Sequence, residues 1–129
     1  MEREFFLTVR DFPFKDIPEQ RRQVIFSDIW LKYGASMVPV ILASNDFELL
    51  KKRFIIPQEM PVAHFIHKLR INYIHNISPP EAIFLFTTEN TIPSGKKTMG
   101  QVAQRHRDIG DGFLYLLLVK ENTFGSRLQ

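Results

Sequence analysis

The sequence contains no cysteine. This absence excludes a disulfide framework, a thiolate zinc finger and an enzyme with a catalytic cysteine, and it suits a reducing compartment. Long apolar runs are also missing, since runs such as residues 82–86 are far shorter than the roughly 20 residues that span a bilayer. No signal-like apolar segment follows the charged N-terminus. We therefore expect a cytoplasmic protein that reaches a membrane only through a lipid or a partner.

The chain has little excess charge of either sign. Its 17 lysines and arginines exceed its 14 acidic residues by three, and they are dispersed along the sequence. No basic arm or recognition motif stands out, so we expect no nucleic-acid partner. Phenylalanine, in contrast, is abundant, with 12 residues in a chain of 129 that is 44% hydrophobic. Such a chain can bury the core of one compact domain.

Two helices are predicted from local signals. The first is expected to begin at Asp16, with Pro18 and Glu19 in its first turn in the manner of a capping box, and to stop at Gly34. Residues 25, 29 and 33 form one apolar stripe on it. Apolar residues at positions 62, 65, 66, 69 and 73 predict a second helix that begins at Pro61.

Strands are predicted at residues 38–42, 53–57, 82–87 and 113–119, with a short helical segment at 98–107. Pro39 places the first of these strands at a sheet edge, and the continuous apolar run 82–87 is typical of a central strand. The order of elements predicts an α+β fold of the β-grasp type, in which a four-stranded mixed sheet surrounds a central helix. The N-terminal helix is then an extension that packs elsewhere on the sheet.

Residues that could carry catalysis do not converge. The loop around Lys96 ends like a phosphate-binding loop, but Asn90 stands where the first glycine is required. No nucleophile elbow is present. His64 and His67 are spaced as a possible metal pair on a helix, but spacing suggests no third ligand, so surface histidines are the better interpretation. We expect neither an enzyme nor a bound metal or cofactor.

Two aromatic residues on the first helix have two readings. Phe26 and Trp30 either pack in the core or form the wall of an apolar pocket beside the edge strand 38–42. In the second reading, an extended peptide adds to the unpaired strand edge and its side chains enter the pocket. Lys51, Lys52 and Arg53 would attract acidic residues that flank the peptide, or they are simply a solvated strand entry.

Six short segments in a fixed order carry a resemblance to a known family. They are VPVI (38–41), KKRFIIP (51–57), EAIFLF (81–86), TMGQV (98–102), DGFLYL (111–116) and ENTFG (121–125). Together they resemble the autophagy ubiquitin-like modifiers of the microtubule-associated-protein light chain and GABA-receptor-associated-protein type, and the likeness covers residues 14–125. The resemblance implies a ubiquitin-like core at residues 38–125, an N-terminal helical extension at 1–37 and a removable tail at 126–129.

The resemblance also implies a function. A cysteine protease would cut after Gly125, next to Phe124, and activating and conjugating enzymes would join Gly125 to phosphatidylethanolamine. The lipid would hold the protein on autophagosomal membranes, where it would recruit cargo receptors that carry an aromatic-x-x-aliphatic motif. The alternative is a ubiquitin-like module that is never conjugated and that binds peptides or the cytoskeleton.

The family's two peptide pockets can be carried over to residues of this chain. By this resemblance, the pocket for the motif's aromatic residue is lined by Phe26, Trp30, Pro39, Ile41, Arg53, Ile55 and Phe113. The pocket for the aliphatic residue is formed by Phe54, Ile56, Pro57, Phe65 and Leu69. Arg70 matches a basic position of the family's central helix.

Overall fold

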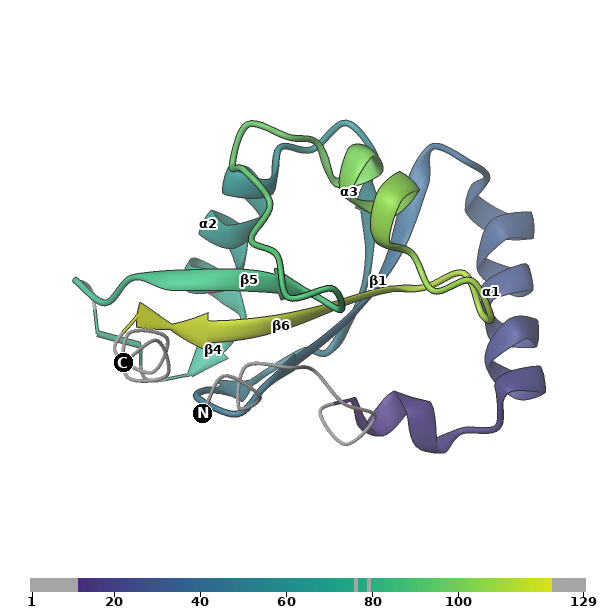
Figure 1. Cartoon of the computed structure of the whole chain (residues 1–129), viewed down its shortest axis with the longest axis horizontal. Helices are drawn as coiled ribbons and strands as arrows, with labels where there is room; N and C mark the ends of the chain where they lie inside the picture. The colour runs from purple at the N-terminus through teal and green to yellow at the C-terminus, as the bar shows by residue number, and fades with distance from the viewer. Residues whose placement is uncertain (1–11, 76, 79, 122–129) are drawn as a thin grey trace.

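The computed structural model describes residues 12–75, 77–78 and 80–121 (Figure 1). A sheet crosses the molecule, with α2 and α3 on one face and α1 on the other. The elements in chain order are the 3-10 helix η3 (Pro13–Asp16), α1 (Glu19–Tyr33), β1 (Met37–Ser44), β2 (Glu48–Leu49), β3 (Arg53–Pro57), α2 (Val62–Asn72), β4 (Ile74–His75), β5 (Ile83–Thr87), α3 (Met99–His106) and β6 (Leu114–Lys120).

The main sheet has the strand order β3-β1-β6-β5 within the described residues. β1 pairs antiparallel with β3 and parallel with β6, and β6 pairs antiparallel with β5. The α+β fold with a four-stranded mixed sheet is therefore confirmed.

Alternation along β1 divides the core into two clusters. Val38, Val40 and Leu42 face α2 and α3, and they join the larger cluster. Ile41 and Ala43 face the opposite way and join the smaller cluster, which α1 and η3 cover. Successive strand residues point to opposite faces, so one apolar strand supplies both layers.

The position predicted for the first strand is wrong. β1 lies inside the sheet, and the edge strand is β3. The N–H of Leu42 donates to the carbonyl of Lys52 at 2.8 Å, so alternate residues of β1 bond toward β3. The nitrogen of Pro39 then points to the other side, where pairing with β6 begins only at Val40. The proline costs no ladder bond because it precedes the paired stretch.

The position predicted for residues 82–87 is also wrong. β5 is the edge strand at the far side of the sheet, and β6 takes the central place beside β1. The apolar run predicted a central strand, but it arises because both faces of this edge strand are covered by the core. Leu85 belongs to the larger cluster and Phe86 to the smaller one.

The helix boundaries were predicted better than the caps. Asp16 ends η3 instead of capping α1, whose N-cap is Pro18 without a side-chain hydrogen bond, so the capping box proposed there is wrong. A capping box does occur at α3, where the hydroxyl of Thr98 accepts from the N–H of Gln101 at 3.1 Å. Gly34 ends α1 as predicted, with a φ of 76° that favours glycine.

The remaining elements agree closely with expectation, apart from η3, β2 and β4, which were not predicted. β3 matches residues 53–57, and α2 begins directly after Pro61. β2 and β4, which pair antiparallel, were not predicted because two-residue strands carry no readable period. Phe124, Gly125 and the tail 126–129 lie outside the described residues. Among the helices that the structure describes, none combines the length and the apolar character needed to cross a bilayer.

Candidate functional site

An apolar groove of about 420 Å³ lies between α1 and the edge strand β3. Its lining combines one face of the helix with residues of β1, of β3 and of the segment just before β6. The lining residues are Ile25, Ile29, Tyr33, Met37, Val40, Lys51, Arg53, Phe54, Ile55 and Phe113. Within the described residues β3 pairs only with β1, so the groove runs beside an open strand edge.

The two walls of the groove follow from the regular spacing of residues along α1 and along β3. Ile25, Ile29 and Tyr33 are four residues apart on α1, so they form one stripe that faces the groove. On β3, Arg53 and Ile55 are the more exposed residues, and they alternate with residues that point into the core. One side of the groove is thus an apolar stripe of α1, and the other is one face of β3 at the edge of the sheet.

Among the described residues, two cations and no acidic side chain line the groove. The ammonium of Lys51 is 5.1 Å from the ring centroid of Phe54 and 5.7 Å from that of Tyr73. The guanidinium of Arg53 is 4.8 Å from the ring centroid of Phe14. Both side chains are exposed, and aromatic faces attract cations at such distances. The groove therefore offers an apolar interior with positive charge at its edge.

Phe26 and Trp30 do not line this groove. Phe26 packs edge-on against Phe113, with ring centroids 5.5 Å apart, and it stacks on Trp30 at 6.4 Å. Trp30 is 46% exposed. The ring of Phe26 also lies so close to Gly112 that a Cβ there would approach it to 2.9 Å. The pair thus packs behind the groove wall that Phe113 forms.

The residues that take their place were visible in the sequence as part of a helical stripe. Ile25 and Ile29 belong to the stripe predicted from periodicity, but they were not included among the predicted pocket residues. On β1, Met37 and Val40 line the groove, whereas Pro39 and Ile41 do not. Ile41 is buried in the smaller core cluster. A shift of one position along the helix accounts for the difference on α1.

The residues expected to form the second pocket lie together, but mostly inside the core. Phe54, Ile56, Phe65 and Leu69 are all at most 8% exposed. The rings of Phe54 and Phe65 meet edge-on at 5.4 Å. Only Pro57, at the end of β3, is exposed. These side chains form the layer beneath α2 in the structure, so a ligand would have to displace some of them to enter there.

The other basic residues singled out from the sequence lie apart from the groove. Lys52 lines a separate cavity of about 300 Å³ together with Pro13, residues 43–45 and residues 47–49. Arg70, near the end of α2, donates a hydrogen bond to the backbone carbonyl of Glu81. Of the basic side chains proposed to receive acidic groups, Lys51 and Arg53 are therefore the two at the groove.

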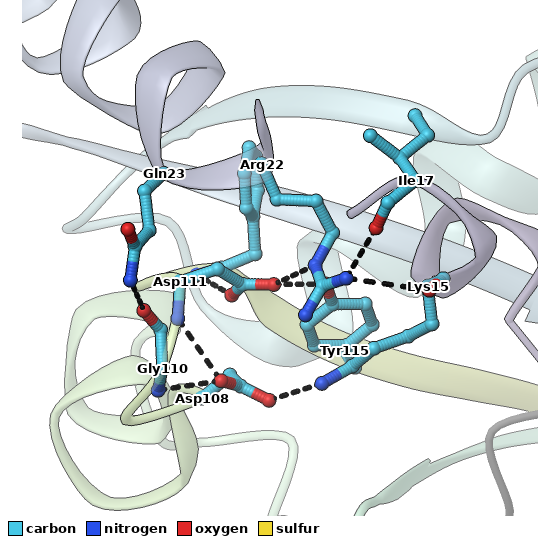
Figure 2. Close-up of polar contacts among 9 residues, drawn as sticks. Lys15, Ile17, Arg22, Gln23, Asp108, Gly110, Asp111 and Tyr115 are labelled. Atoms are coloured by element: carbon cyan, nitrogen blue, oxygen red, sulfur yellow. Dashed lines mark hydrogen bonds and ion pairs between the residues drawn. The ribbon is translucent and has the colours of Figure 1, made fainter. Parts of the chain in front are cut away.

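A buried polar network anchors α1 against the sheet (Figure 2). The Nε of Arg22 donates to Asp111 at 2.8 Å, and both residues are buried. The same carboxylate accepts a hydrogen bond from the hydroxyl of Tyr115. Arg22 also donates to the backbone carbonyls of Lys15, at 3.3 Å, and Ile17. The network ties η3, α1 and the start of β6 together, and so fixes the helix that forms one groove wall.

The network shifts the pKa values of its members. Burial lowers the pKa of Arg22, but the hydrogen bond and charge of Asp111 outweigh it and the pKa rises. Burial and the bond to Asp111 both raise the pKa of the Tyr115 hydroxyl. Arg22 is therefore a fixed cation and Tyr115 a neutral donor. No local pattern predicts this network, because Arg22 and Asp111 are 89 positions apart in the chain.

A partly exposed ion pair extends the network. Lys15 pairs with Asp108, and the side-chain amide of Gln23 donates to the carbonyl of Gly110 at 2.8 Å (Figure 2). Burial raises the pKa of Asp108, but the hydrogen bonds from Lys15 and from the backbone of the turn lower it by a larger amount. The pKa of Asp108 is therefore below its ordinary value. The turn at residues 108–112 is thereby held against both η3 and α1.

The histidines do not assemble into a metal centre in the part of the chain that the structure describes, where no group of three or more His, Cys, Asp or Glu side chains could hold a metal ion. His64 and His67 lie exposed on α2. His106 pairs with Glu89.

The fold is that of a ubiquitin-like protein, and α1 of its helical extension forms one wall of a groove beside a sheet edge. A family model for the autophagy protein Atg8, ubiquitin-like, matches residues 21–125. The chain belongs to the Atg8 family. The family resemblance seen in the sequence segments is thereby confirmed, and the protein is an autophagy protein of the ubiquitin-like type.

Individual relatives agree. The chain is 42% identical to autophagy-related protein 8D of Oryza sativa subsp. japonica over 92 residues, which cover 68% of this chain and 75% of the relative. It is 34% identical to autophagy-related protein 8 of Dictyostelium discoideum over 117 residues, which cover 88% and 93%. The crystal structure of Trypanosoma brucei ATG8 superposes with a TM-score of 0.71 at 21% identity, covering 86% of this chain and 96% of that one, and supports the fold.

Proposed function

We propose that this chain is an autophagy modifier that recruits partner proteins through the groove between α1 and β3. The observation that carries the proposal is the open edge of β3 beside an apolar groove with two cations. An extended peptide can add to such an edge, where main-chain hydrogen bonds fix its register and pockets select its side chains. The partners are then cargo receptors with an aromatic-x-x-aliphatic motif.

The groove suits the aromatic residue of that motif. Its interior is apolar, with Ile25, Ile29 and Phe113 among the lining residues, and a ring buried there leaves water. Acidic residues before the ring would meet Lys51 and Arg53. The aliphatic residue would lie near Pro57, at the far end of β3, and would enter by displacing buried neighbours of Ile56.

Conjugation is the second part of the proposal. A cysteine protease hydrolyses the bond between Gly125 and Ser126. The activating enzyme then joins the new carboxylate of Gly125 to the AMP part of ATP, with release of pyrophosphate. A cysteine thiolate of that enzyme displaces AMP to form a thioester, which is passed to a cysteine of the conjugating enzyme. The amine of phosphatidylethanolamine then displaces the thiolate and forms an amide. The two acyl chains of the lipid hold the protein on the autophagosome membrane. In this scheme the chain is a substrate and adaptor, and not an enzyme.

The groove is tested by titrating the chain with a synthetic aromatic-x-x-aliphatic peptide in a calorimeter. Ile29→Glu puts a charge in the groove wall, so we expect it to weaken binding more than tenfold. Leu31→Glu is the matched control, because Leu31 is 82% exposed on α1 and does not line the groove. Equal affinity of the Ile29 variant and the native chain would refute the groove assignment.

Conjugation is tested by intact mass. The chain recovered from starved cells should end at Gly125 and carry the mass of a phosphatidylethanolamine, and Gly125→Ala should abolish both changes. A chain that stays full-length and soluble but still binds the peptide would refute conjugation and support the unconjugated module.

A further inference from the structure

The groove is supported by a residue that does not line it. We propose that Phe14, in η3, is a positioning residue for the groove: it holds Arg53 and Phe113 in place for an aromatic peptide with an acidic neighbour. This inference rests on the proposed peptide-binding function. It extends the recognition site to the 3-10 helix that precedes α1.

Phe14 contacts the groove from behind at two points. Phe14 is 7% exposed, and its ring meets the ring of Phe113 edge-on, with centroids 5.0 Å apart. The guanidinium of Arg53 lies 4.8 Å from the centre of the same ring. One buried side chain therefore touches both an apolar lining residue and one of the two cations of the groove.

The contact with Arg53 matters because that side chain is exposed. A free arginine side chain samples many rotamers, and fixing it on binding costs conformational entropy. Stacking of the guanidinium on an aromatic face restricts those rotamers before a ligand arrives. The positive charge is thereby held in advance at the place where an acidic group of the peptide would come.

Phe14 is itself held in place by the anchoring network. The side chain of Arg22 donates to the carbonyls of Lys15 and Ile17, on either side of the end of η3. The N–H of Ile17 donates to the carbonyl of Phe14 at 3.1 Å, and Lys15 pairs with Asp108. The ring thus sits on a segment that is tied to the folded core, and it can serve as a fixed support.

A pair of peptides separates positioning from general packing. Both carry the same aromatic-x-x-aliphatic motif, and one has aspartate before the aromatic residue where the other has asparagine. Phe14→Leu keeps an apolar side chain but removes the aromatic face. We expect it to lower the affinity for the aspartate peptide about two- to fivefold more than the affinity for the asparagine peptide. Phe12→Leu is the control, because Phe12 precedes the same helix but packs against Tyr115, at 5.2 Å.

The coupling between the two residues is measured with a third variant, Arg53→Gln. In the Arg53→Gln background, Phe14→Leu should no longer discriminate between the two peptides. If Phe14→Leu lowers the affinity for both peptides equally, and Arg53→Gln does not change this result, the inference is overturned and Phe14 is a purely structural residue. In that case the peptides still bind the native chain, so the proposed function stands.

The contact itself can be observed without any peptide. In the native chain the side-chain protons of Arg53 lie over the ring of Phe14, so their NMR resonances should be shifted upfield. Phe14→Leu should remove that shift, whereas Phe12→Leu should leave it. A shift that survives Phe14→Leu would overturn the inference whatever the peptides do. A native chain that keeps the shift but binds neither peptide would instead refute the proposed function, and this inference with it.

Discussion

Replacing Asp111 by alanine should destabilise the protein more than any surface change. Asp111 is 3% exposed, and its carboxylate accepts hydrogen bonds from Arg22, from the hydroxyl of Tyr115 and from the N–H of Phe113 at 2.9 Å. Asp111→Ala removes all three bonds and leaves the guanidinium of Arg22 buried without its counter-ion. Breaking a buried pair in this way costs about 3–5 kcal/mol.

That cost is large for a domain of this size. Small domains are stable by only about 5–15 kcal/mol, so the variant should lose about a fifth or more of its free energy of unfolding. The midpoint of thermal unfolding should fall by roughly 10–20 °C. Urea titration followed by the fluorescence of Trp30 measures the effect, because this residue is the single tryptophan of the chain and lies on α1, the helix that the network anchors.

Two further variants define the result that would refute this reasoning. In the double variant Arg22→Met/Asp111→Ala no charge is left buried, so its cost should be smaller than the sum of the single costs by about 1 kcal/mol or more. Lys15→Met should cost only about 0–1 kcal/mol, because its ion pair with Asp108 is partly exposed. A cost below about 1 kcal/mol for Asp111→Ala, or strict additivity, would show that the buried pair does not hold the helix.

Three smaller effects follow from the same structure. The pKa of Asp108 is lowered in the folded state, so its ionised carboxylate stabilises the fold at pH values above its ordinary pKa of 3.8. This stabilisation is lost as the pH falls through the lowered pKa of the folded state. Lys15→Met should reduce the loss of stability in acid, as measured by urea titrations at several pH values. Gly112→Ala should lower the thermal midpoint more than Gly34→Ala: both φ angles are positive, but only at Gly112 would a Cβ meet a ring, at 2.9 Å, and equal losses would contradict this account. Thr98→Ala removes the capping box of α3 and should cost about 1 kcal/mol in urea unfolding, whereas no measurable loss would show that the cap contributes nothing.

Local periodicity predicted most of the fold. The stops at Gly34 and Pro57, the start after Pro61 and the strand order along the chain all follow from signals within a few residues. The place of each strand in the sheet does not. Pro39 would have kept β1 out of the interior of the sheet only if its nitrogen faced a paired residue of a neighbouring strand. Pairing with β6 begins one residue later, at Val40, and this register depends on a strand far along the chain.

The groove could be predicted only in part, for a similar reason. Arg53 and Ile55 of β3 were carried over from the family resemblance, and the structure places both in the groove lining. On α1, a rotation of one residue exchanges Ile25 and Ile29 for Phe26 and Trp30, and the helical pattern alone does not fix that rotation. Arg22 and Asp111 set it through a contact between distant parts of the sequence.

The place of β6 between β1 and β5 has a consequence for synthesis. Because this last described strand occupies the middle of the sheet, a nascent chain that ends before residue 114 has no partner for β5 and cannot join the two halves of its core. The domain therefore cannot close until β6 has been synthesised. Until then its apolar strands stay open to chaperones, and shortening the chain into this strand removes the fold rather than trimming it.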